Sequence, residues 1–121
     1  MITDGMLTEM AKALASESYV VPSYAAWATS YNPITSSMTA ITSEVGTRTT
    51  ITDSRSGATV TFGGIRSGTS VPVPAGQTLY TLGAYSALTS GTLLTAVSLP
   101  AIIHTTTFDI DLDITYTINR Q

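Results

Sequence analysis

The sequence has no cysteine, one histidine, one tryptophan and few charged residues. The absence of cysteine excludes disulfides, thiolate nucleophiles and cysteine-ligated metals, and it leaves the redox state of the compartment open. Charged residues make up 11% of the chain, less than half of the usual share of about a quarter. In their place stand 14 serines and 23 threonines among 121 residues. Because charge normally keeps protein surfaces apart, this composition is typical of a protein held in an assembly.

The net charge is −3, and the five basic residues are scattered: Lys12, Arg48, Arg55, Arg66 and Arg120. No basic patch is available to neutralise phosphates, so we expect no nucleic-acid partner. No apolar run has the length that spans a bilayer, and the first residues lack a basic region followed by an apolar core. We therefore expect a soluble chain with no export signal and no membrane partner.

The length of 121 residues fits a single domain over residues 1–121. A helix is predicted at about residues 4–15, with Thr3 as its N-cap and Asp4 favourably placed near the positive end of the helix dipole. Glu9 lies on the predicted polar face of this helix. The predicted packing face has apolar residues at i, i+3, i+4 and i+7: Leu7, Met10, Ala11 and Leu14.

The rest of the chain is predicted to be mainly β. Strand-length patterns occur at residues 24–31, 47–53, 58–65, 78–85, 92–99 and 108–118. Turn signals at about ten-residue spacing predict an antiparallel β-sandwich or barrel of about six strands, with the helix packed across an edge or open end. Residues 54–57 are predicted to connect a hairpin, and Pro100 to end the fifth strand. The Gly- and Pro-rich residues 66–77, with Val71 and Val73, are predicted to form a protruding arm.

The final predicted strand, FDIDLDITYTI, carries a row of three acids, Asp109, Asp111 and Asp113, which we call the aspartate row. Alternate residues of a strand share one face but lie too far apart to wrap a cation. A calcium loop also needs glycine at its sixth position and glutamate at its twelfth, where this chain has Ile114 and Arg120. We therefore favour a row that faces water or a partner over a metal site. Such a row also discourages edge-to-edge strand pairing.

The other polar residues give little indication of catalysis. His104 is the only histidine, no GxSxG motif surrounds any serine, and Phe62-Gly63-Gly64 lacks the spacing of a phosphate-binding loop. A Ser-His-Asp arrangement remains open by composition, but we favour a surface histidine. Trp27 and Tyr31 are a candidate glycan platform, with core packing of Trp27 the favoured alternative. We expect no enzymatic activity, no cofactor and no metal.

Five segments together resemble small structural proteins of tailed phages, and in particular the virion-attaching N-terminal domains of some tail fibres. The segments are ITDGMLTEMAKALA (2–15), SEVGTR (43–48), YTLGAY (80–85), SGTLLTAVSLP (90–100) and FDIDLDITYTI (108–118). The resemblance covers nearly all of the chain, and SGTLLTAV is the most similar segment. It implies a docking module in the virion, assembled in the host cytoplasm, that contacts copies of itself and other virion proteins. It assigns no catalytic residue.

Three functions are consistent with these observations. The first is a non-enzymatic virion protein, in multiple copies, that serves as a tail, baseplate, collar or fibre-attachment adaptor. The second is a capsid decoration (cement) protein, whose helix and sandwich clamp neighbouring shell subunits while its arm or N-terminus reaches across a seam. The third is a glycan-binding module that uses Trp27 and Tyr31. The candidate interface residues are Asp109, Asp111, Asp113, Arg48, Arg55, Arg66, Val71 and Val73.

Overall fold

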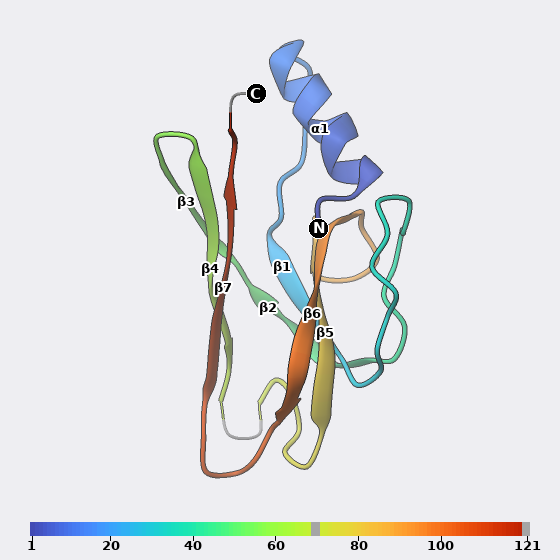
Figure 1. The fold of residues 1–121 in the computed structure, drawn as a ribbon, viewed down its shortest axis with the longest axis vertical. Coiled ribbons are helices and arrows are strands. Elements are labelled where there is room, and N and C mark those ends of the chain that lie inside the picture. Colours follow the sequence, from blue (N-terminus) through green and yellow to red (C-terminus); the bar gives the residue numbers. More distant parts are fainter. Residues whose placement is uncertain (69–70, 120–121) are drawn as a thin grey trace.

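The computed structural model describes residues 1–68 and 71–119 and consists of a β-sandwich with one N-terminal helix (Figure 1). The elements are α1 (Asp4–Leu14), β1 (Tyr24–Ala28), β2 (Glu44–Thr50), β3 (Thr52–Ser56), β4 (Thr59–Ser67), β5 (Thr78–Tyr85), β6 (Leu93–Ile103) and β7 (Ile110–Thr117). One sheet has the order β2-β1-β5-β6 and the other β3-β4-β7. All pairings are antiparallel. The predicted mainly β fold is confirmed, and because the sheets do not close it is a sandwich and not a barrel.

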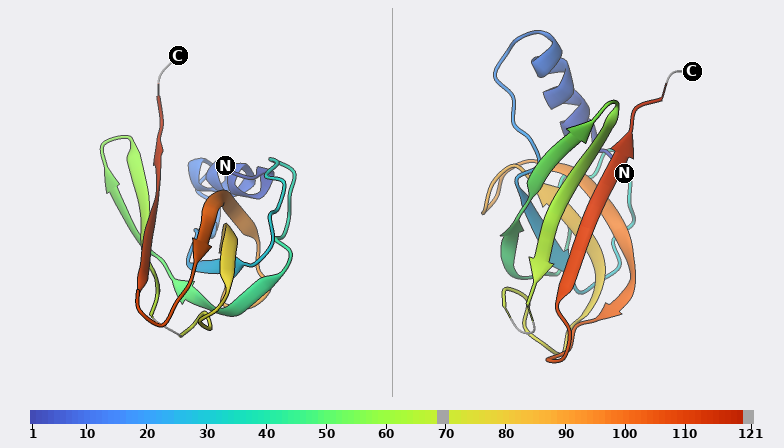
Figure 2. Two further views of the ribbon diagram at one scale, coloured as in Figure 1. Left: turned by 60° about the horizontal axis from the view of Figure 1, so that its bottom comes forward. Right: turned by 90° about the vertical axis from the view of Figure 1, so that its left-hand side faces the viewer.

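The two sheets are joined where β2 runs into β3, on either side of the buried Ile51 (Figure 2). The predicted single strand at 47–53 is therefore two strands. The predicted connection at 54–57 is also wrong, since Ser54 to Ser56 belong to β3 and pair with β4. Gly57, with a φ of 58°, begins the tight turn that joins the two strands. Strand β3 is an exposed edge strand, so its residues are polar and show no apolar alternation. Such a run has no pattern that distinguishes it from a loop.

The core lies between the two sheets and draws residues from both. Trp27 in β1 is fully buried there, with an exposed fraction of 0%. The main cluster includes Ala25, Ile51, Phe62, Ile65, Val73, Leu79, Leu82, Ala84, Ile110 and Ile114. The favoured interpretation of Trp27 as a core residue is thus confirmed, and its role in a glycan platform is wrong. Tyr31 is exposed and lies beyond the end of β1.

The predicted facing of β7 is confirmed. Ile110 and Ile114 are buried against the opposite sheet, while Asp111 and Asp113 are exposed on the outer face. The alternation loses its core contacts beyond the ends of the strand, where Phe108 and Ile118 are exposed. The hydroxyl groups of Tyr116 in β7 and Thr95 in β6 are hydrogen-bonded, which ties the two strands across the open side of the sandwich.

Strand β6 continues past Pro100 to Ile103, so the predicted end at Pro100 is wrong. The pairing with β5 shifts between Leu79 and Thr81, which lie opposite Ile102 and Ser98. Two additional residues of β6 therefore bulge out at this point, and Ala101 takes a positive φ of 51°. Proline is tolerated here because a bulge places its nitrogen outside the ladder of hydrogen bonds.

The N-cap of α1 is as predicted. The Thr3 hydroxyl accepts a hydrogen bond from the Met6 N–H (3.3 Å) and donates one to the Leu93 carbonyl (2.7 Å). The Thr3 N–H also donates to the Leu94 carbonyl (3.1 Å). These bonds fix the start of the helix to the first residues of β6, so the helix leaves the end of the sandwich from a rigid base.

The predicted packing face of α1 is wrong. Leu7, Met10 and Leu14 are exposed, and Leu14 has an exposed fraction of 90%. Glu9, expected on the polar face, is covered instead, with an exposed fraction of 7%. Its carboxylate accepts a hydrogen bond from the Val20 N–H (2.9 Å) and pairs with Lys12 (2.8 Å). The contact between Glu9 and residues 15–23, which run back toward the sandwich, therefore sets the orientation of the helix. Met6 of α1 packs against the main core.

Candidate interaction surfaces

The aspartate row lies exposed along the outer face of the β3-β4-β7 sheet. Asp111 accepts a hydrogen bond from the Arg66 guanidinium (3.2 Å) of the neighbouring strand β4. Asp113 lies over Gly63, where a Cβ would be 2.9 Å from its carboxylate oxygen. Within residues 1–68 and 71–119, no group of three or more His, Asp or Glu residues is arranged to hold a metal ion. The arrangement suits contact with water or with donors on a partner.

We expect added Ca²⁺ or a chelator to leave the thermal midpoint unchanged. A ligand stabilises a fold only when it binds the native state in preference to the unfolded chain, and neighbouring carboxylates on a strand supply too few oxygens for Ca²⁺. Thermal melts in millimolar CaCl₂ and in EDTA provide the measurement. A metal site would be shown if EDTA lowered the thermal midpoint of the wild type by several degrees, if Ca²⁺ restored it, and if EDTA had no such effect on the Asp111→Asn variant.

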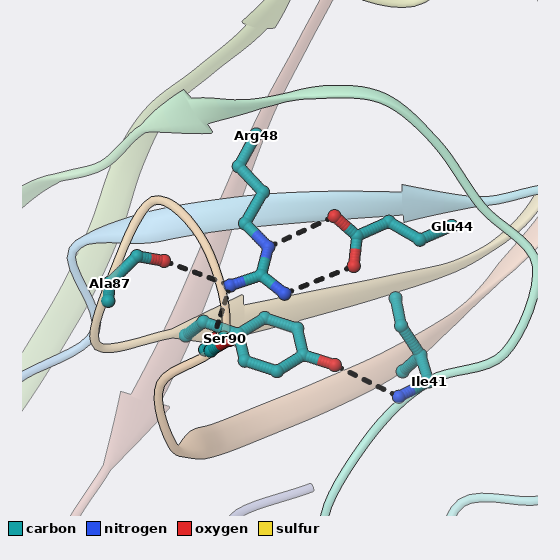
Figure 3. A network of polar contacts seen from close by, with 6 residues as sticks. Ile41, Glu44, Arg48, Ala87 and Ser90 are labelled. Atoms are coloured by element: carbon teal, nitrogen blue, oxygen red, sulfur yellow. Dashed lines mark hydrogen bonds and ion pairs between the residues drawn. The ribbon is translucent and has the colours of Figure 1, made fainter.

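Arg48 is committed to its own chain, so its assignment to an interface is wrong. Its side chain is 8% exposed and forms two hydrogen bonds with the Glu44 carboxylate (3.0 and 3.1 Å). It also donates to the carbonyls of Ala87 (2.9 Å) and Ser90 (2.6 Å), and its guanidinium lies 3.7 Å from the centre of the Tyr85 ring (Figure 3). The group thus fixes the loop between β5 and β6 to strand β2.

A bulge in β2 brings Glu44 and Arg48 together. Ala25 and Trp27 are two residues apart in β1, but their partners Thr49 and Val45 are four apart in β2. The two additional residues of β2 include Gly46, with a φ of 71°. This geometry accounts for the SEVGTR segment: glycine permits the bulge, and the bulge shortens the distance between the acid and the arginine.

The segment 71–77 folds back onto the sandwich, so the prediction of a protruding arm is wrong for these residues. Val73 is fully buried, and its N–H donates to the Ser67 hydroxyl (3.3 Å). A Cβ on Gly46 would lie 2.3 Å from the Pro72 carbonyl oxygen, which shows how closely the segment covers the bulge of β2. Residues 69–70 of the predicted arm lie outside the described residues. Val71 remains an exposed apolar side chain, whereas Val73 is core.

His104 is buried, with an exposed fraction of 1%, and is not the surface histidine that the sequence suggested. Its Nε2 lies 2.7 Å from the Gly68 carbonyl and 3.4 Å from the Ser67 hydroxyl, and its Nδ1 lies 3.3 Å from the Pro74 carbonyl. Ser67 is also fully buried. With both side chains sealed and the imidazole bonded to main chain, the pair clamps the folded-back segment and offers no access to a substrate.

A group of exposed apolar side chains extends from α1 into the residues that follow it. We call this the helix patch: Leu7, Met10, Leu14, Tyr19, Val20 and Val21. Beside it lies an open groove of about 350 Å³, lined by Met6, Val21, Pro22, Val60 and Phe62 together with Asp53, Ser54 and Arg55. Exposed apolar patches of this kind mark binding surfaces, because a monomer in water gains nothing from them.

The two remaining arginine candidates are exposed. Arg55 lies in the edge strand β3 and donates a hydrogen bond to the Gly57 carbonyl (2.8 Å). Arg66 lies in β4 and forms an exposed ion pair with Asp111 (3.2 Å). Both guanidinium groups therefore keep donors available on the surface of the β3-β4-β7 sheet.

Glu9 should make the fold sensitive to acid. The Lys12 ammonium and the Val20 N–H, in that order, hold the pKa of Glu9 below its ordinary value of 4.5. A carboxyl whose pKa is lower in the folded state stabilises the fold at neutral pH, and this contribution is lost as the pH falls through the folded pKa. We therefore expect Glu9→Gln to lower the thermal midpoint at pH 7 and the difference from the wild type to shrink as the pH falls through the folded pKa of Glu9, measured as a series of melts. A constant difference at every pH would contradict the charge effect.

Searches against protein-family models, curated proteins and solved structures found no match for this chain. No helix in the described part of the chain is long and apolar enough to cross a membrane.

Proposed function

We propose that the chain is a non-enzymatic structural protein of a tailed-phage virion, which assembles with copies of itself and with other virion proteins as a tail, baseplate, collar or fibre-attachment adaptor. The observation that carries the proposal is the helix patch. It leaves Leu14 almost entirely exposed at the end of a helix whose base is fixed to the sandwich. An apolar surface on a chain with few charges is stable when a partner covers it.

The resemblance to virion-attaching domains agrees with this placement of the patch. The segment ITDGMLTEMAKALA forms α1 and its flanking residues, and it supplies half of the helix patch. The segment SGTLLTAVSLP supplies the start of β6, which holds Thr3 and the N-terminus. The residues that carry the resemblance thus build a fixed docking helix.

The capsid-decoration alternative has less support, because it used the arm and the N-terminus to reach across a seam. Residues 71–77 fold onto the sandwich, and the N-terminal amino group donates to the Ala96 carbonyl (2.5 Å). Residues 71–77 and the first residues of the described chain are therefore bonded to the sandwich and do not extend from it. The glycan alternative loses Trp27 to the core.

Purified particles test the proposal directly. Quantitative mass spectrometry should detect the chain in tailed-phage particles at the copy number of a ring or fibre set, and gold-labelled antibody should place it on the tail. Hundreds of copies on the head would instead identify a decoration protein. Abundance in infected cells with no copies in particles would refute a structural role.

The helix patch gives a prediction for the isolated protein. Leu14→Asp should keep the wild-type thermal midpoint, because the side chain is exposed, while it weakens association by placing a charge in the covered surface. Sedimentation velocity over a concentration series, alone and with the partner proteins of the particle, provides the measurement. Leu88→Asp is the matched control, since Leu88 is also exposed but lies in the loop between β5 and β6. Equal association of both variants and the wild type would exclude the helix patch.

A further inference from the structure

Strand β7 has a free edge. It pairs with β4 and, among the described strands, with no other. The Ile118 N–H donates to the Ala58 carbonyl beside β4 (2.9 Å). Since successive residues of a strand direct their main-chain groups to opposite sides, even-numbered residues of β7 pair with β4 and odd-numbered residues present free N–H and C=O groups. Figure 2 shows β7 at the border of its sheet. A free edge of eight residues is a template for another strand.

The polarity of this edge is divided along its length. The odd-numbered side chains all lie exposed on the outer face, acids in the first half and neutral donors in the second: Asp109, Asp111, Asp113, Thr115, Thr117 and Asn119. A partner strand that runs in the opposite direction with the same sequence meets each acid with a neutral side chain. The aspartate row thus discourages other pairings and favours one.

We propose that the free edge of β7 is an isologous interface, at which β7 of a second copy adds in antiparallel orientation around a two-fold axis at Ile114. This inference rests on the proposed self-assembly and specifies its contact. The outer pairs across the axis are Asp113 with Thr115, Asp111 with Thr117 and Asp109 with Asn119. The two three-stranded sheets then form one sheet of six strands.

The inner face of the same pairing is apolar. Ile114 meets its own copy, Leu112 meets Tyr116, and the exposed Ile118 meets Ile110 of the second copy. On the outer face, the hydroxyl groups of Thr115 and Thr117 and the amide of Asn119 lie opposite the carboxylates and supply hydrogen-bond donors. A shift of the axis to Leu112 sets Asp111 against Asp113, and like charges directly opposite one another destabilise a strand pair. Charge therefore selects the register as well as the partner.

Engineered cysteines test the register, because the natural chain has none and every thiol is an introduced one. In the proposed pairing, odd-numbered residues that lie directly opposite one another exchange main-chain hydrogen bonds. The Cα atoms of such a pair lie about 5.5 Å apart, within the range that a disulfide spans. Asp111→Cys and Thr117→Cys proteins, mixed and oxidised, should yield the mixed disulfide dimer in large excess over either self-linked dimer. The pair Asp113→Cys and Thr117→Cys is the control, since these positions are opposite only if the axis lies at Thr115.

A charge exchange tests the interface independently. Thr115→Asp sets the new carboxylate opposite Asp113 of the second copy on both sides of the two-fold axis, and it should weaken dimerisation on the order of tenfold. The double variant with Asp113→Asn should restore dimerisation. Analytical ultracentrifugation gives the dissociation constant of each. An oligomer without the mixed disulfide and without this rescue would overturn the β7 interface and leave self-assembly standing. A monomer at every concentration would overturn both.

Discussion

Gly46→Ala should lower the free energy of unfolding by about 3 kcal/mol or more. A side chain at a φ of 71° is strained by about 1–2 kcal/mol. The added Cβ would also lie 2.3 Å from the Pro72 carbonyl oxygen and 3.1 Å from the Val73 Cα, both backbone atoms that have no alternative rotamer. Either the bulge of β2 or the buried segment at Val73 must shift. Urea denaturation followed by Trp27 fluorescence measures the loss.

Gly57→Ala separates the two causes. Gly57 has a similar φ of 58°, but a Cβ there meets nothing within 4 Å. Its replacement should therefore cost only the backbone term, about 1 kcal/mol. Equal losses in the two variants would mean that the contact with Pro72 does not constrain the bulge, and that only the backbone conformation matters.

The sequence predicted best where a local pattern and the tertiary contacts agree. Strand β5 has the predicted bounds, Thr78–Tyr85, because turn residues limit it on both sides and apolar residues fill it. Thr3 caps α1 because its hydroxyl needs only the helix's own N–H groups, three residues away. The facing of β7 followed from strict alternation between Ile110 and Ile114. In each case the deciding contacts lie within one element or between alternating apolar residues and the main core.

The orientation of α1 could not be predicted from its own periodicity. The spacing of Leu7, Met10 and Leu14 describes an apolar face, but periodicity alone does not say whether the face covers this core or a partner. The decision comes from Glu9, whose bond to the Val20 N–H fixes the return of the chain. A carboxylate eleven residues from the N–H that donates to it gives no pattern in a helical window. The same exposed face is now the main argument for assembly.

The candidate sites failed where burial depends on distant segments. His104 lies 36 residues from the Gly68 carbonyl that its imidazole contacts, and Arg48 lies 39 residues from Ala87. Val73 appeared exposed because prolines flank it, yet Ser67 and the bulge of β2 draw it into the core. The signal for Arg48 was present in the SEVGTR segment, as an acid and an arginine around a glycine. Only the register of β2 against β1 gives that signal its meaning.

Ile114→Asp should abolish folding or lower the free energy of unfolding by several kcal/mol. Ile114 is buried on the inner face of β7 opposite Phe62, within the main core. A carboxylate at this position has no cationic partner in the cluster and must be buried charged or take up a proton, and both are costly. Soluble yield and the thermal midpoint provide the measurement. A wild-type midpoint would mean that the facing of β7 is reversed.

Ile118→Asp is the matched control, with the same substitution on the same face of the same segment. Ile118 has an exposed fraction of 63%, so its carboxylate stays in water and the fold should lose less than about 1 kcal/mol. The comparison is made in dilute protein, where association does not contribute to the midpoint. At higher protein concentration the control variant should differ from the wild type in dimerisation. Ile118→Asp should fold and yet dimerise poorly, because the proposed β7 interface places this side chain against Ile110 of the second copy.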